Sequence, residues 1–205
     1  SAAGILVEKM PRRELDQLVS GRHQGVAARA VFSESSWHEK DLRRLLEGLD
    51  HDPLLLVLDE VTDPHNLGAC LRTADAAGVD AVVIPRHGAA GMGPTVSKVA
   101  AGAAEVLPLA RVGNLKRVFG WLAEYGVRII GTSDKADHSV FDADFSGPLA
   151  LAMGREHTGL GEALVSRCDS LVSLPMKGVV SSLNVSVATG VCLYEITRQR
   201  ALQSR

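Results

Sequence analysis

The feature that most constrains this fold is a regular alternation, from residue 54 onward, of short apolar runs with longer amphipathic stretches. The first run, residues 54–58, is continuously apolar, as a parallel strand covered on both faces must be. Strands alternating with helices at this spacing predict an α/β fold with a mostly parallel sheet flanked by helices. The predicted strands are residues 54–58, 81–84, 105–109, 127–130, 149–153 and 171–174. The predicted helices are residues 37–49, 66–77, 95–104, 115–125 and 183–200.

Composition limits the kind of protein. A chain of 205 residues suits one domain of ordinary size plus a tail, and 46% hydrophobic residues indicate a packed core. There is no run of 18 apolar residues and no basic-then-apolar start, so we expect neither a membrane span nor a signal peptide. Three cysteines without CxxC spacing favour a reducing, cytoplasmic setting and no metal site. A net charge of −2 does not by itself indicate nucleic acid, so any basic surface must be local.

The stretch from residue 171 to residue 199 reads as strand, turn and helix. Pro175 stops the strand, and Ser181 or Ser182 is placed to cap the helix. Small residues around Gly190 leave the middle of that helix thin, which favours close approach of another backbone. Asn184 lies in the first turn, where free N–H groups attract ligand oxygens.

Three ordered motifs in this chain resemble those of the SPOUT class of RNA ribose 2′-O-methyltransferases. They are LDEVTDPHNLGACLRTADAAGVDAVVIP at residues 58–85, LAMGREHTGLG at 151–161 and SLPMKGVVSSLNVSVATGVCLYE at 173–195. Within the class the chain is most similar to the bacterial enzymes that methylate a guanosine ribose in 23S rRNA. The resemblance implies a C-terminal deep trefoil knot, which periodicity alone does not predict because knots are rare. It also implies that residues 1–30 are the remnant of an RNA-binding domain and linker, and that residues 31–205 form the catalytic domain.

No GxGxxG follows the first predicted strand of this chain, so the ordinary dinucleotide-binding loop is missing. The SPOUT class nevertheless binds S-adenosylmethionine. The resemblance places this methyl donor in a pocket built from three loops that follow strands, with no metal. Without the resemblance, the loop glycines would read as ordinary strand-end turns. The cofactor-binding candidates are Gly131, Thr132, Gly154, Leu174, Met176 and Leu183.

Five polar residues match the catalytic positions of the class: Asn66, Arg72, Glu156, Ser182 and Asn184. A guanidinium at Arg72 could stabilise a developing ribose alkoxide, although an arginine is too basic to be an ordinary general base. The acceptor of the hydroxyl proton therefore stays open. Helix periodicity puts Asn66 and Arg72 on different sides of one helix. Without the resemblance, Arg72 would read as a surface residue, Glu156 as a first-turn glutamate, and Ser182 and Asn184 as capping residues.

Two other functions remain in view: methylation of a tRNA ribose, and a non-catalytic RNA-binding factor of ribosome assembly. The predicted partners are RNA, most specifically 23S rRNA, and a second copy of this chain. The helix at 183–200 carries Val185, Cys192 and Ile196 on one side. The line of Leu183, Val187, Val191 and Tyr194 lies on another side. A helix that is apolar over so wide an arc must bury both sides, which predicts a homodimer through this helix.

Overall fold

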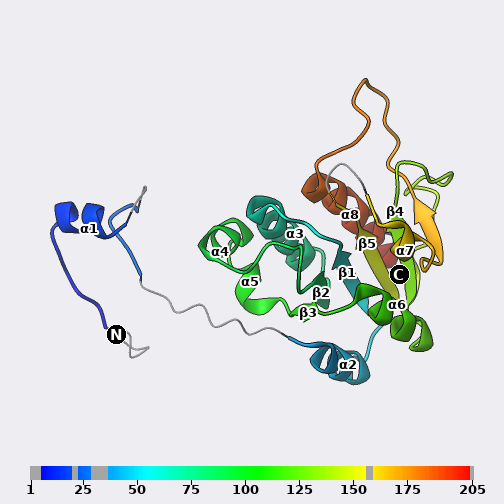
Figure 1. The fold of residues 1–205 in the computed structure, drawn as a ribbon, viewed down its shortest axis with the longest axis horizontal. Helices are drawn as coiled ribbons and strands as arrows, with labels where there is room; N and C mark the ends of the chain where they lie inside the picture. Colours follow the sequence, from blue (N-terminus) through cyan, green and yellow to red (C-terminus); the bar gives the residue numbers. More distant parts are fainter. Residues whose placement is uncertain (1–5, 20–22, 29–36, 156–158, 204–205) are drawn as a thin grey trace. The chain divides into compact units, whose positions relative to one another are not determined.

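The computed structural model describes residues 6–19, 23–28, 37–155 and 159–203, and the chain divides into two compact units (Figure 1). The described residues of the first unit, Ser1–Ser33, form one helix, α1 (Arg12–Leu18), which buries none of its side chains. The second unit, Glu34–Arg205, holds every strand and the candidate site.

A six-stranded sheet forms the centre of the second unit, and all its strand pairs are parallel, as the alternation predicted. The spatial order is β3-β2-β1-β5-β4-β6. Because every strand runs the same way, all the carboxyl ends meet at one edge, where ligands of open α/β sheets bind. The strands are β1 (Leu54–Leu58), β2 (Ala81–Pro85), β3 (Leu109–Val112), β4 (Arg128–Thr132), β5 (Leu149–Met153) and β6 (Ser170–Val172).

Helices cover both faces of this sheet, so the central strands are buried on both sides. Leu56 of β1 packs into the cluster on one face and Leu55 into the cluster on the other, and both are fully buried. Helices of the first face are α3 (Pro64–Ala76), α4 (Pro94–Ala100), α5 (Ala103–Val106) and α8 (Val185–Gln203). Helices of the second face are α2 (Glu39–Gly48), α6 (Leu115–Glu124) and α7 (Glu162–Val165).

The region of residues 95–109 differs from the sequence prediction. A single helix at 95–104 and a strand at 105–109 were expected, but the helix breaks at Ala101 and Gly102, whose φ angles are 53° and 100°. The left-handed turn starts the short helix α5, and the strand begins only at Leu109. Small residues without a strong period left this boundary undetermined.

Helix α8 begins later than predicted, and its cap is neither Ser181 nor Ser182. The side chain of Asn184 accepts the Ser186 N–H at 2.9 Å, and the Asn184 carbonyl accepts the Ala188 N–H at 2.9 Å. Asn184 is therefore the residue that caps α8.

The two apolar sides predicted for this helix are both present. Cys192, Leu193 and Ile196 are fully buried against the chain's own core. On the other side, Val187 and Tyr194 are 52% and 55% exposed.

Helices α3 and α8 lie side by side and run in the same direction. Successive contacts join Asn66 to Asn184, Cys70 to Thr189, and the Ala77 carbonyl to the Thr197 hydroxyl. The amino ends of both helices therefore open at the same place. The close approach expected at Gly190 is ordinary van der Waals contact: an added Cβ would lie 3.7 Å from the Thr73 methyl group.

Among the described residues, no helix is long and apolar enough to cross a membrane. Nor does this part of the chain contain three His, Cys, Asp or Glu side chains gathered as metal ligands.

Candidate functional site

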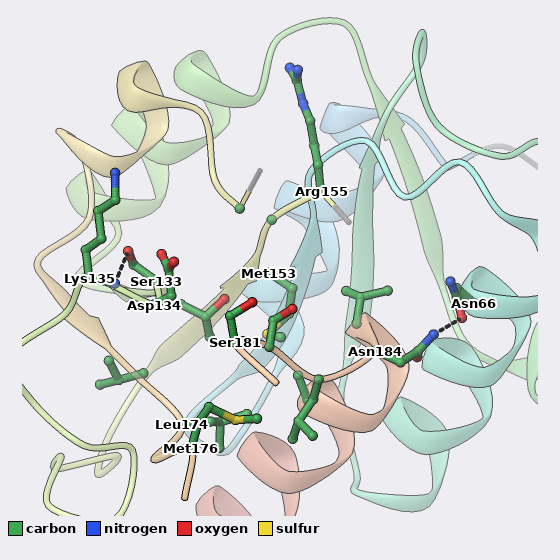
Figure 2. A pocket seen from close by; sticks show the side chains of 18 of the residues that line it. Asn66, Ser133, Asp134, Lys135, Met153, Arg155, Leu174, Met176, Ser181 and Asn184 are labelled. Atoms are coloured by element: carbon green, nitrogen blue, oxygen red, sulfur yellow. Dashed lines mark hydrogen bonds between the residues drawn. The ribbon is translucent and has the colours of Figure 1, made fainter. Parts of the chain in front are cut away.

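A cavity of about 760 Å³ opens at the carboxyl ends of β4, β5 and β6, against the amino ends of α3 and α8 (Figure 2). Its volume falls in the range of small-molecule and cofactor sites. Three segments after strands and two helix starts therefore share one space. The lining residues are Asp63, Asn66, Thr132, Ser133, Asp134, Lys135, Met153, Gly154, Arg155, Gly159, Val172, Leu174, Met176, Ser181, Ser182, Leu183, Asn184, Val185 and Ala188.

The wall after β5 depends on a close approach of two backbones at Gly154. A Cβ at this position would lie 2.0 Å from the Gly159 carbonyl carbon and 2.0 Å from the Leu160 nitrogen. Arg155 and Gly159 exchange two backbone hydrogen bonds of 3.0 and 3.1 Å across the same turn. Only glycine fits at residue 154, and its fit brings the turn against the cavity.

Two asparagines join the helix starts at the opposite side of the cavity. The Asn184 amide nitrogen donates to the Asn66 side-chain oxygen at 3.0 Å, as Figure 2 shows. The Asn184 side-chain oxygen is already used as the helix cap. Helix α3 is capped by Asp63, whose carboxylate accepts the His65 N–H at 2.8 Å. Two helix amino ends, each partly positive, thus point towards one region of the cavity.

The structure brings most of the sequence-predicted residues to this cavity. Five of the six cofactor candidates and three of the five catalytic candidates line it. They are Thr132, Gly154, Leu174, Met176 and Leu183 from the first set, and Asn66, Ser182 and Asn184 from the second. Glu156 lies outside the described residues, as does its neighbour His157.

Two predicted residues are placed elsewhere. Gly131 is a buried residue inside β4. A Cβ at this position would lie 2.8 Å from side-chain atoms of Cys168 and Leu160. Gly131 therefore packs against the turns that flank α7 and does not line the cavity. Arg72 is exposed on α3 and is not among the cavity residues. Six residues of helix separate it from Asn66, which turns its side chain to another face. Within the described residues, Arg72 makes no hydrogen bond or ion pair.

Some cavity residues were not singled out from the sequence. Asp134 and Lys135 lie two and three residues after the end of β4 and line the side opposite Asn66 and Asn184 (Figure 2). Asp63 also lines the cavity, in addition to its capping role. The signal that could have found Asp134 and Lys135 is their place immediately after a buried strand, at the edge where parallel sheets bind ligands.

A charged group lies at the edge of the cavity, between the segment after β1 and the turn after β5. Arg155 donates to the Glu60 carboxylate at 2.8 Å. Asp59 is only 5% exposed and accepts the Gly161 N–H at a long 3.4 Å. Burial raises the pKa of the Asp59 carboxyl, and this hydrogen bond and the nearby Arg155 charge oppose the rise in pKa. The group ties the first and second motifs together.

The cavity offers two different chemical environments. Leu174, Met176 and Leu183 supply apolar surface for a flat ring. Ser133, Asp134 and Lys135 supply hydroxyl, carboxylate and ammonium groups at another side. A ligand with a base at one end and charged groups at the other would match both.

A sequence profile of the SpoU rRNA Methylase family matches residues 53–194. The chain belongs to this family. The matched region includes all six strands, every cavity residue and most of α8. SpoU membership thus confirms the methyltransferase resemblance.

Curated members of the SpoU family are similar over nearly the whole chain. The Yersinia pestis 23S rRNA (guanosine-2′-O-)-methyltransferase RlmB is 52% identical over 204 residues, covering 99% of this chain and 82% of that protein. The RlmB of Pseudomonas aeruginosa is 54% identical over 201 residues, covering 97% of this chain and 81% of that protein.

Solved SpoU structures share the fold. AviRb from Streptomyces viridochromogenes, in complex with AdoMet, superposes with a TM-score of 0.72 at 35% identity, over 78% of this chain and 62% of that one. The A. aeolicus TrmH/SpoU tRNA modifying enzyme superposes with a TM-score of 0.69 at 30% identity, over 81% and 85%.

Proposed function

We propose that this chain transfers a methyl group from S-adenosylmethionine to the ribose 2′-hydroxyl of a guanosine in 23S rRNA. The observation that carries the proposal is the single cavity where three strand-end segments meet the Asn66–Asn184 pair. The guanosine and the 23S rRNA come from the named activity of relatives that are more than half identical over four-fifths of their length.

The donor set of the cavity fits S-adenosylmethionine. Leu174, Met176 and Leu183 would hold the adenine, and backbone groups beside Gly154 would hydrogen-bond its edge. Asp134 and Lys135 are suited to the ammonium and carboxylate of the methionine part. When bound, this cofactor supplies a methyl group activated by a sulfonium.

The remaining chemistry belongs to the chain's own residues. The ribose oxygen must form a bond to the methyl carbon as the sulfur–carbon bond breaks, and the hydroxyl proton must leave. Asn66, Asn184 and Ser182 lie where they can orient the ribose. A cation at Arg72 would stabilise the developing alkoxide, and Glu156 would orient the guanidinium or take up the proton.

A second copy of the chain would bring Arg72 to a cavity. Arg72 is exposed and does not line the cavity of its own chain, and it lies on the helix that packs beside α8. The exposed side of α8 offers Val187 and Tyr194 as an apolar surface. In a twofold dimer built on this surface, each Arg72 would serve the ribose bound by its partner. Val187→Asp should give monomers in light scattering, whereas a charge at Ile196 would unfold the buried core. A wild-type chain that is monomeric at micromolar concentration would refute the dimer.

We further propose that the segment after β6 is threaded to form a trefoil knot. The segment between β4 and β5 is hydrogen-bonded to the residue that follows β6. The Val140 N–H donates to the Ser173 carbonyl at 2.8 Å. The same segment is bonded to α8, since the Gln199 amide donates to the Ala143 carbonyl at 2.9 Å. Residues 1–30 would belong to an RNA-binding extension and its linker. Pulling the ends apart in a single-molecule experiment should leave a chain shorter than its contour length if the knot exists.

The test of the function is methyl transfer from radiolabelled S-adenosylmethionine to purified RNA. Unmodified 23S rRNA should be labelled at one guanosine ribose, mapped by mass spectrometry, and tRNA should not. Arg72→Ala should abolish transfer but leave cofactor affinity unchanged, because an interaction made only in the transition state is lost. Labelled tRNA with unlabelled rRNA would favour the tRNA alternative. Tight RNA binding without transfer would favour the non-catalytic one.

Cofactor binding is tested separately by calorimetry on ligand-free protein. One S-adenosylmethionine should bind per chain, and Leu183→Arg should prevent this binding because it puts a long cation into the apolar part of the cavity. Unchanged affinity in that variant would mean that the cofactor binds elsewhere.

A further inference from the structure

The ion pair between Glu60 and Arg155 stands at the edge of the cavity and has no part in the chemistry described above. Arg155 lines the cavity, and its side chain is 45% exposed. Figure 2 shows this side chain extending away from Met153 and Leu174. A single guanidinium N–H is bonded to Glu60, at 2.8 Å, so further donors face solvent.

The backbone of Glu60 is held in an unusual conformation that aims its carboxylate at Arg155. Its φ is 53°, in the left-handed region that residues other than glycine seldom adopt. Gly88 leaves room for the side chain: a Cβ there would lie 3.1 Å from the Glu60 Cγ and Cδ atoms. The left-handed backbone of Glu60 and the absence of a side chain at Gly88 thus together allow the Glu60 carboxylate to reach Arg155.

An RNA substrate would bring its own anions to this place. Every internal ribose carries phosphates on its 3′ and 5′ oxygens, so a 2′-hydroxyl that enters the cavity brings two phosphates to the edge. Among the described cavity residues, the cationic side chains are Lys135 and Arg155. Lys135 lies across the cavity from Asn66 (Figure 2). The forked donors of Arg155 suit a phosphate better than a lone ammonium does.

We propose that Arg155 binds a phosphate next to the target ribose, and that Glu60 is a built-in competitor that occupies the guanidinium until RNA arrives. This inference rests on the proposed function. The pair can exchange because both side chains are more than one-third exposed, and ion pairs in that environment are weak. Exchanging a carboxylate for a phosphate leaves one anion on the guanidinium throughout. Glu60 would then weaken binding of any RNA that cannot place a phosphate at Arg155.

The two partners should therefore have opposite effects on RNA affinity. Arg155→Gln should weaken binding and reduce the slope of log affinity against log salt by roughly 0.7 to 0.9, the value for one lost phosphate contact. Glu60→Gln should tighten binding by roughly 1.5- to 5-fold, the equivalent of one exposed ion pair. Glu60→Gly is a second variant, because glycine adopts a φ of 53° freely.

The measurement is fluorescence anisotropy on a 23S rRNA fragment that the wild-type protein methylates, over a range of salt concentrations. Glu39→Gln is the matched control: Glu39 pairs with Arg117 at 2.6 Å, on helices of the other sheet face. It removes the same charge and should leave RNA affinity unchanged.

Three results would overturn the inference. Variants at Glu60 and Arg155 that both weaken RNA binding, with lower melting temperatures, would make the pair a structural tie. Weaker binding of S-adenosylmethionine by Arg155→Gln, with an unchanged salt slope, would assign this cation to the cofactor carboxylate. Equal changes in RNA affinity for Glu60→Gln and Glu39→Gln would mean that the change in net charge alone accounts for the effect. If the wild-type protein methylates no 23S rRNA, the proposed function fails first, and the two failures are distinguishable.

Discussion

Replacing Gly154 with alanine should move the turn that forms one wall of the cavity. The new Cβ would lie 2.0 Å from two backbone atoms, the Gly159 carbonyl carbon and the Leu160 nitrogen. Nonbonded carbon atoms ordinarily rest about 3.5 to 4.0 Å apart. The turn must therefore retreat by roughly 1.5 to 2 Å, because backbone atoms cannot rotate away as a flexible side chain can.

The size of the effect follows from what that movement breaks. Two hydrogen bonds between Arg155 and Gly159 are lost or stretched. At about 1 kcal/mol each, with overpacking strain added, the free energy of unfolding should fall by roughly 2 to 4 kcal/mol. Both residues line the cavity, so affinity for S-adenosylmethionine should fall on the order of 100-fold, as for a 1 Å displacement of a precise site.

Gly161→Ala is the matched control in the same motif. Its φ is −60°, and an added Cβ would lie 3.9 Å from the nearest atom, an Asp59 carboxylate oxygen. Urea unfolding and calorimetry with S-adenosylmethionine should give wild-type values for Gly161→Ala and reduced values for Gly154→Ala. A Gly154→Ala protein with wild-type stability and affinity would refute the reasoning.

Three further predictions concern stability and are checked by urea or thermal unfolding. Asn184→Ala should cost about 1 kcal/mol of unfolding free energy by removing the α8 cap, and Ser182→Ala should cost little; equal losses would contradict the assignment of the cap. Gly190→Ala should stabilise α8 by up to about 1 kcal/mol. Gly68→Ala should destabilise the protein, because the added Cβ would lie 2.8 Å from the Val99 Cβ. A more stable Gly68→Ala protein and a less stable Gly190→Ala protein would contradict these contacts. Hydrogen bonds, first to Asp80 and then to Asp50, raise the pKa of His51. Protonated His51 therefore stabilises the fold fully below about pH 6.5, and this contribution is lost as pH rises through the raised pKa. His51→Gln should remove this pH dependence of the unfolding free energy.

The sequence predicted the sheet well where apolar runs are continuous. Residues 54–58 and 149–153 are strands with the predicted bounds, because a strand buried on both faces tolerates no polar residue. Prediction failed at residues 101–106, where small residues suit helix and strand equally and a left-handed turn decides.

The candidate site shows the same division. Predicted site residues on strand ends and helix starts, such as Thr132 and Asn184, line the cavity. Gly131 was assigned to a loop because a sequence does not fix a strand end to within one residue, and here the strand continues through Thr132. The Glu60–Arg155 pair joins residues 95 positions apart, so no local pattern could indicate it.

The parallel contact of α3 with α8 also determines when a binding site can exist during protein synthesis. Asn66 and Asn184 meet across 118 positions of sequence. The five consecutive residues from Ser181 to Val185, together with Ala188, complete the cavity. A ribosome that has released β1 through β5 has made most of the sheet but has not yet made this wall. Closing so long a loop is the slow, non-local step of folding. A nascent chain that extends only to β5 therefore lacks the wall that completes this cavity.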